Sequence, residues 1–291
     1  MANEQNQVWH EEGERFREAL GFTAAQTGFS ARLIEKDYYC SISLRELAPL
    51  HTAGLVFKGG TALSKVHANF YRLSEDLDFA ISIASDASRT ARRAAIQPVK
   101  RHLADLRSRA TWLDGITDLT GANESTQYLS ELTYVSCLSG EVESIRLEIA
   151  LREPLVQPSE MAPAMTILMN PLTTLAAHAP FSVSVISRQE AYAEKIRAAL
   201  CRREAAIRDF YDLDHALEAG IVGRDDAGLL ELANRKIAIP FNDAPDLSPE
   251  RLGTLRQQIH PQLRPVLREE DFHRFDLDRV VDTLRRWGYG G

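Results

Sequence analysis

The sequence has few of the residues that mark secreted, zinc-stabilised or membrane proteins. Three cysteines occur in 291 residues, far apart and odd in number, which argues against a disulfide framework, and no two have zinc-ligand spacing. The eight histidines form no HxxxH or HxxH pair. No apolar run reaches the roughly 20 residues that a membrane helix needs, and the first 20 residues hold no apolar signal core. We expect a cytoplasmic protein that makes no contact with a membrane.

Lysine is also scarce, since 28 of the 34 basic residues are arginine and six are lysine. Each lysine therefore needs inspection, although a codon bias toward arginine explains the ratio equally well. The net charge of -7 argues against a uniformly basic, nucleic-acid-binding surface, but it is compatible with a local basic patch. The hydrophobic content of 44% is that of a globular chain with one large core or two modest ones.

Apolar spacing predicts an α/β first half. Residues 13–48 fit two helices, the second capped by Ser30. Residues 55–83 fit strand, glycine turn, helix and strand. A basic helix is expected over 88–108, kinked or divided at Pro98. Alternation of apolar and polar residues then predicts strands over 129–137 and 144–152, with Ser139 and Gly140 near the turn between them.

The second half reads as helical to its end. Helical spacing covers 188–203 and 208–220, with Gly220 as a C-cap, and Ser248 with Pro249 marks a further helix start. We therefore expect a two-lobed α+β protein. Residues 1–180 would form a catalytic lobe with a mixed sheet, and 181–291 a helical lobe that completes the active cleft.

Two acids in the string SEDLDF are the strongest functional signal. Side chains alternate across a strand, so Asp76 and Asp78 project from one face and Leu77 from the other. Two adjacent carboxylates resist joint ionisation unless a cation lies between them, and their hard oxygens suit Mg²⁺ or Mn²⁺. Solvated acids at a strand end are the ordinary alternative for an isolated DxD.

A third acid, Glu148, lies in the middle of the apolar string SIRLEIAL. A carboxylate there needs a partner, which a metal on Asp76 and Asp78 would supply. A salt bridge to Arg146 or Arg152 on an edge strand would serve equally well, and the spacing leaves both interpretations open.

Gly59, Gly60 and Thr61 lie between a strand and a helix, where backbone N–H groups can approach a phosphate closely. Tight strand-to-helix turns need glycine in any case, so two glycines alone are weak evidence. Fifteen residues separate Gly60 from Asp76, enough for one helix and a return strand. This spacing places the turn and the acid pair at the same end of the sheet.

The strings FKGGTALSKV, RLSEDLDF and RDFYDL together resemble the AbiEii/AbiGii group of nucleotidyltransferase toxins, which includes the mycobacterial MenT toxins, within the DNA polymerase β-like superfamily. The resemblance covers about residues 30–220. It implies a metal-dependent enzyme of the 2.7.7 class that transfers a nucleoside monophosphate from an NTP to a hydroxyl. In a two-metal arrangement, one ion lowers the pKa of the attacking hydroxyl and the other stabilises the departing pyrophosphate.

The resemblance also implies roles for individual residues. Asp76 and Asp78, together with Glu148, would hold the metal, and Lys195 and Asp209 would complete the catalytic set. The expected nucleotide-binding residues are Gly59, Gly60, Thr61, Lys65, Arg72, Ser74 and Asp212. Each of four residues also has a structural alternative. Lys65 could be a solvated surface residue, and Arg72 and Ser74 could brace the loop. Asp209 could be the N-cap of its helix.

In this family the acceptor is the 3′ end of tRNA, whose extension blocks aminoacylation and translation. Several arginines and one lysine are expected to contact the phosphates of the RNA. A solvated helix face is the ordinary alternative for any single run of charged residues. The expected RNA-binding residues are Arg92, Arg93, Lys100, Arg101, Arg202, Arg203 and Arg208. A cognate antitoxin is implied, and a monomer is expected. Two alternatives remain: transfer to a protein or small-molecule hydroxyl, and a non-catalytic protein that binds a nucleotide or partner.

Overall fold

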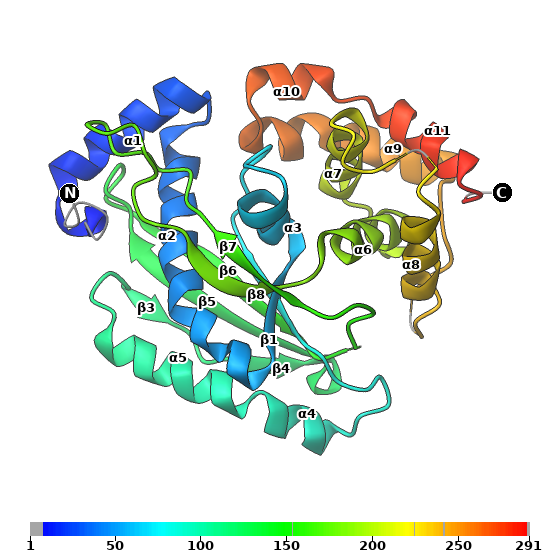
Figure 1. Cartoon of the computed structure of the whole chain (residues 1–291), viewed down its shortest axis with the longest axis horizontal. Coiled ribbons are helices and arrows are strands. Elements are labelled where there is room, and N and C mark those ends of the chain that lie inside the picture. Colours follow the sequence, from blue (N-terminus) through cyan, green and yellow to red (C-terminus); the bar gives the residue numbers. More distant parts are fainter. Residues whose placement is uncertain (1–7, 153, 224, 241, 290–291) are drawn as a thin grey trace. The chain divides into compact units, whose positions relative to one another are not determined.

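The computed structural model describes residues 8–152, 154–223, 225–240 and 242–289 (Figure 1). The chain divides into two compact units. The first consists of residues 1–155 and 159–186, and the second of residues 156–158 and 187–291. The first holds the sheet and the second is helical, so the expected fold class is confirmed.

The first unit begins with the short 3₁₀ helix η2 (Trp9–Glu11), then α1 (Gly13–Thr27), α2 (Ala31–Leu47) and the 3₁₀ helix η3 (Ala48–Ala53). Ser30 caps α2 as predicted, because its Oγ accepts a hydrogen bond from the N–H of Leu33. The two helices expected over residues 13–48 are therefore present, separated by Gly28 in a left-handed conformation (φ 77°).

An eight-stranded mixed sheet forms the core of the first unit. The strand order is β3-β5-β6-β2-β1-β8-β7, with β4 also pairing with β5. Strand β1 runs antiparallel to β2 and parallel to β8, and β2 runs parallel to β6. The bounds are β1 Leu55–Lys58, β2 Leu77–Ile81, β3 Gly115–Ile116, β4 Thr120–Ala122, β5 Gln127–Val135, β6 Val142–Ala150, β7 Glu160–Ala164 and β8 Phe181–Val185.

Strands β5 and β6 form the predicted hairpin, shifted two residues toward the N-terminus from the expected bounds. Gly140 has φ 75° and its N–H donates to the carbonyl of Ser136, so the turn is built between Ser136 and Glu141. The turn takes up residues 136–141, so β5 ends at Val135 rather than at 137 and β6 begins at Val142 rather than at 144.

The two faces of this sheet differ. Alternate residues of the hairpin, such as Leu132 and Ile145, are buried on one face. Helix α2 covers that face, where Tyr39 stacks on Tyr134 of β5 with ring centroids 3.8 Å apart. On the opposite face, Asp78 and Glu148 occupy neighbouring register positions of β2 and β6 and are partly exposed. The tertiary arrangement thus leaves the acids on the less covered face.

A basic segment connects β2 to β3. It forms α4 (Arg89–Ala95) and α5 (Gln97–Arg109), divided at Ile96, and Pro98 lies in the first turn of α5. A proline is tolerated there because the first N–H groups of a helix have no intrahelical partner. The predicted division near Pro98 is confirmed.

The second unit consists of helices. Residues 181–185, which were expected in the helical lobe of residues 181–291, instead form strand β8 of the first unit. The helices are α6 (Arg188–Cys201), α7 (Ile207–Glu218), α8 (Ala227–Ile237), α9 (Pro249–Gln258), η6 (Ile259–Leu263), η7 (Arg264–Val266), α10 (Glu269–Arg274) and α11 (Leu277–Arg286). Ser248 caps α9 as predicted. Gly220 follows the end of α7 with φ 64°. Within the described residues, no helix is both long and apolar enough to cross a membrane.

Candidate active site

The glycine turn after β1 lies directly against an acid of the predicted pair. Gly59 has φ 78°, a conformation that L side chains rarely adopt, and a Cβ at this position would lie 2.3 Å from Oδ2 of Asp78. Helix α3 (Gly59–Ala62) starts at this residue and continues as the π-helical segment η4 (Leu63–His67). Both glycine backbone and carboxylate are therefore at the same end of the sheet, as the spacing predicted.

Arg72 and Ser74 surround the second glycine of the turn. A Cβ on Gly60 would lie 2.4 Å from a terminal nitrogen of Arg72 and 3.3 Å from Oγ of Ser74. Arg72 is 2% exposed, and its carbonyl accepts a 2.7 Å hydrogen bond from Ser64 of η4. These contacts match the loop-bracing alternative for Arg72 and explain why position 60 has no side chain.

Thr61 connects the turn to the acid loop. Its side chain is buried, and its hydroxyl donates to the carbonyl of Asp76. The hydroxyl is thus directed into the protein, and it ties the backbone of the first acid to the start of α3. Thr61 positions Asp76 in this arrangement.

Lys65 was expected to support the phosphates or to be solvated, and it does neither. It is 1% exposed, and Nζ lies 2.5 Å from Oδ1 of Asp37 and 2.7 Å from Oγ of Ser41, both on α2. The other oxygen of Asp37 accepts hydrogen bonds from Thr166 and from the N–H of Ile167. The ammonium is therefore fully engaged in the core, and Lys65 leaves the set of nucleotide-binding residues.

Asp37 is a residue that the sequence analysis missed. It lies in α2 beside Glu35, another buried acid, whose oxygens accept hydrogen bonds from Ser136 and the N–H of Cys137. Two acids within the predicted helical segment are the only signal that the sequence offered. The partners come from distant segments, which is why the pairing could not be predicted.

Cys40, also on α2, is a nearby nucleophile by residue type. Burial raises the pKa of its thiol to about 12, and Sγ lies 3.8 Å from the carbonyl oxygen of Glu75. The group stays protonated at physiological pH, so it packs as a small apolar side chain rather than reacting.

Glu148 forms a salt bridge with Arg146, which was one of its two expected roles. Its Oε2 lies 3.0 Å from a terminal nitrogen of Arg146 on the same strand. Glu148 is also the register neighbour of Asp78 across β2 and β6. Among the described residues, no three His, Cys, Asp or Glu side chains form a cluster able to hold a metal ion. The expected three-acid set is therefore not assembled.

The pair Asp76 and Asp78 nevertheless fits a magnesium ion. Magnesium commonly binds one or two carboxylates and completes its shell with water and substrate phosphate oxygens, so a third protein ligand is not required. Both acids are partly exposed and both supply hard oxygen donors. The glycine turn beside Asp78 leaves backbone close to the position where such phosphates would bind.

The second unit holds a separate charged cluster around Lys195 of α6. Its Nζ lies 2.8 Å from Oδ1 of Asp209 and 2.8 Å from Oδ2 of Asp212, both on α7. The two acids are three residues apart on one helix and so share a face, as predicted. Lys195 retains 13% side-chain exposure, whereas Asp212 has none. A partly exposed ammonium is thus fixed by two buried carboxylates.

Asp209 is in the first turn of α7 but does not cap it. The N-cap position is occupied by Ala206, which has no side-chain capping bond. The Asp209 carboxylate instead binds Lys195 and, at 3.2 Å, Arg202. The N-cap alternative for Asp209 is therefore wrong. On the same helix, burial lowers the pKa of His215, so this imidazole stays neutral near the cluster at physiological pH.

The expected RNA-binding arginines divide into two groups. Arg92 is buried, with its guanidinium on the carbonyls of Leu151 and Ser85, so it belongs to the interior and is removed from the RNA-binding set. Arg208 is half-buried and donates to the carbonyl of Gln262. The exposed or half-exposed members are Arg93, Lys100, Arg101, Arg202 and Arg203.

A strand, a glycine turn and a carboxylate pair on a mixed sheet define the nucleotidyltransferase class of fold. A model of the family described as nucleotidyl transferase AbiEii toxin, type IV toxin–antitoxin system, matches residues 44–282. The chain belongs to this family of nucleotidyltransferase toxins. None of the curated proteins matches the chain.

One solved structure supports the fold. The crystal structure of JHP933 from Helicobacter pylori superposes with a TM-score of 0.52 at 15% identity, covering 89% of this chain and 91% of that one. A second H. pylori structure, described as a candidate nucleotidyltransferase, gives a TM-score of 0.46 at 16% identity and covers 88% of each chain.

Proposed function

We propose that this chain transfers a nucleoside monophosphate from an NTP to the 3′ end of tRNA and thereby blocks translation. The observation that carries the proposal is the contact between the Gly59 turn and the carboxylate of Asp78, on a chain of the AbiEii family. It brings a phosphate-binding backbone and an acid pair to one sheet end. Family membership also supports an antitoxin as a partner.

In this reaction an acceptor hydroxyl oxygen bonds to the α-phosphorus of the NTP, the bond to the β-phosphate bridge breaks, and pyrophosphate leaves. The backbone N–H groups at Gly59 and Gly60 would bind the β and γ phosphates. Arg72 and Ser74, which lie against Gly60, would hold the turn in place. Asp76 and Asp78 would hold magnesium or manganese ions. A divalent ion, when bound there, would acidify the attacking hydroxyl and neutralise charge on the leaving pyrophosphate.

Lys195 would supply positive charge to the triphosphate. A lysine ammonium acts as a compact point charge, and here two carboxylates restrict it to one position. Asp209 and Asp212 would thus act through Lys195, as positioning residues. The assignment of Asp212 as a direct nucleotide contact becomes less favourable, because its side chain has no exposure.

The test is incubation of the purified chain with one tRNA transcript, Mg²⁺ and each labelled NTP in turn. Asp76→Asn and Asp78→Asn remove the acid pair, and Lys195→Arg keeps a charge while Lys195→Met removes it. We expect label in the tRNA with the wild type, loss of label with either asparagine variant and with Lys195→Met, and partial retention with Lys195→Arg.

The other outcomes contradict the proposal in distinguishable ways. Label in protein would assign a protein hydroxyl as acceptor. Release of pyrophosphate without labelled RNA or protein would mean that the nucleotide is transferred to a small hydroxyl compound of the mixture, such as water or a second NTP. Binding of NTP without turnover, in a chain shown to be folded by circular dichroism, would assign a non-catalytic role.

A further inference from the structure

The segment α4–α5 has a charge that contrasts with the rest of the chain. Residues 89–109 contain seven basic residues and one acid, Asp105, in a protein whose net charge is -7. A cluster of one sign on an oppositely charged chain concentrates an attractive field for anions at that surface. Cations that the fold itself does not use are available to bind such an anion.

Only part of this charge is used inside the protein. Arg92 is buried on backbone carbonyls, and Arg109 lies 2.6 Å from Glu46. By contrast, Arg93, Lys100 and Arg101 form no ion pair with any residue that the structure describes. Arg107 donates to the carbonyl of Ile116, and its one ion pair among the described residues is with Asp118, at 3.4 Å, where the two side chains are 52% and 89% exposed. Such an exposed pair contributes little and is easily exchanged for another anion.

Three of these cations form a stripe along the segment. Arg93, Lys100 and Arg107 are spaced seven residues apart. Backbone hydrogen bonds continue across the division, from Ile96 to Arg92 and from Lys100 to Ile96. Seven helical residues rise roughly 10 Å, so neighbouring cations of the stripe are far enough apart to contact different phosphates. The stripe therefore presents one cation to each of several separate phosphates along a strand.

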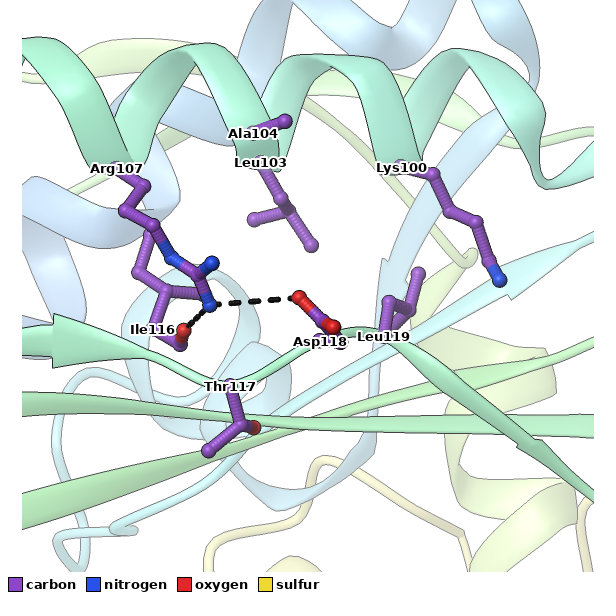
Figure 2. A pocket seen from close by; sticks show the side chains of 8 residues that line it. All are labelled: Lys100, Leu103, Ala104, Arg107, Ile116, Thr117, Asp118 and Leu119. Atoms are coloured by element: carbon purple, nitrogen blue, oxygen red, sulfur yellow. Dashed lines mark hydrogen bonds and ion pairs between the residues drawn. The ribbon is translucent and has the colours of Figure 1, made fainter.

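A pocket opens along this stripe (Figure 2). It lies between α5 and the segment 116–119, and its volume is about 230 Å³. Leu103 points into the space between Lys100 and Arg107, and Leu119 lies on the opposite side, so two cations flank an apolar floor. The volume is below the roughly 300–1,000 Å³ of pockets for whole small molecules. It suits part of a polymer, one nucleotide with its phosphate against a cation, better than a free NTP.

The pocket is also separate from the glycine turn within the first unit. Asp76 lies just before the first residue of β2, at one end of the sheet. Helix α4 comes after the last residue of β2, and Arg92 of α4 binds the carbonyl of Leu151, which follows the last residue of the parallel strand β6. The glycine turn and α4 are therefore at opposite ends of these strands. Lys100 covers the ring of Tyr128, which is buried on the sheet face opposite Asp78. A ligand that reaches both places must be much longer than an NTP.

We propose that α4–α5 is an accessory RNA-binding site that holds the body of the acceptor RNA away from the reacting 3′ end. The phosphate backbone lies along Arg93, Lys100 and Arg107, and one nucleotide enters the pocket between the latter two. Asp118 occupies the anion position beside Arg107 until a phosphate replaces it. This inference rests on the proposed function, because it assumes that the acceptor is an RNA.

The test uses the full chain and two RNA probes, a complete tRNA transcript and a minihelix that contains only its acceptor stem. Affinity is measured by fluorescence anisotropy without NTP, over a range of salt concentrations, and transfer of label is measured on both RNAs. The variant is the triple substitution Arg93→Gln, Lys100→Gln and Arg107→Gln. Its matched control, Arg256→Gln, Arg264→Gln and Arg285→Gln, removes three arginines whose side chains are 50–54% exposed on the second unit.

We expect the triple variant to bind tRNA at least about tenfold more weakly. The slope of log affinity against log salt concentration should become shallower by about 0.9 for each lost phosphate contact. Transfer to the minihelix should stay unchanged, because the shorter RNA does not reach the stripe. Asp118→Asn should strengthen tRNA binding about two- to fivefold, since it removes the competing anion.

Three results would overturn the inference. They are unchanged tRNA affinity in the triple variant, an equal loss in the control variant, or an equal loss of transfer to the minihelix. If the wild type labels neither RNA, the proposed function itself fails. If it labels both while the triple variant behaves as wild type on tRNA, only the accessory site fails.

Discussion

Oδ2 of Asp78 lies 2.3 Å from the position that a Cβ of residue 59 would occupy. No side chain larger than a hydrogen atom can be placed there without moving either the acid or the turn. Because φ of Gly59 is also 78°, an L residue would strain the backbone as well. The glycine is thus required by the position of the carboxylate, independently of any contact with phosphate.

Gly59→Ala should therefore lower nucleotidyl transfer by at least about a hundredfold, the effect expected when a reacting group is displaced by about 1 Å. Steady-state rates with saturating NTP measure this. Gly253→Ala is the matched control, because, apart from the neighbouring residues and backbone of α9 itself, nothing lies within 4 Å of a Cβ at that position. It should stabilise the protein by about 0.5–1 kcal/mol and leave the rate unchanged. Full activity in Gly59→Ala would contradict the predicted geometry.

Lys65→Met should destabilise the protein by about 3–5 kcal/mol, because it leaves the carboxylate of Asp37 buried without its cation. Urea denaturation measures the free energy of unfolding. The double variant Lys65→Met with Asp37→Leu should recover part of the loss, since no unpaired charge remains. A raised KM for NTP with unchanged stability would instead restore Lys65 to the phosphate site.

Glu148→Gln should reduce the transfer rate by less than about tenfold, whereas Asp78→Asn should reduce it by on the order of a hundredfold or more. The difference follows from the contact of Glu148 with Arg146, a half-exposed pair that contributes little. Rates at several Mg²⁺ concentrations make the comparison. If Glu148→Gln raised the Mg²⁺ requirement as much as Asp78→Asn, Glu148 would be a metal ligand after all.

The stability of the protein should fall below about pH 6.5. Burial lowers the pKa of His10, His178 and His215 from the ordinary value of 6.5. Between the lowered pKa values of the folded state and pH 6.5, the unfolded chain binds more protons than the folded one. The stabilisation that these neutral histidines contribute is therefore complete above pH 6.5 and is lost as the pH falls toward their folded-state pKa values. Each proton contributes at most about 1.4 kcal/mol per pH unit.

Urea denaturation at pH 7.5 and pH 5.5 measures the change. His178→Phe should make the free energy of unfolding less dependent on pH, because it removes one of the titrating groups from the interior. A stability that rises on acidification would contradict the sign of all three pKa shifts.

The sequence by itself determined the elements and the local chemistry. Ser30 and Ser248 predicted helix starts because a cap depends on a few adjacent residues. The glycine turn and the alternation around Asp76 and Asp78 likewise follow from local rules of strands and turns. The spacing of Asp209 and Asp212 put both on one face of α7, and Lys195 meets them there.

Tertiary structure alone decided which charges serve the fold. Lys65 and Arg92 look like phosphate ligands in the sequence, yet Asp37 and the carbonyl of Leu151 hold them in the interior. The partners of Lys65, Arg92 and the pocket residues come from segments that local periodicity does not connect. A buried charge must be paired wherever the fold brings a partner, and that partner is set by the packing of the whole unit rather than by neighbouring residues.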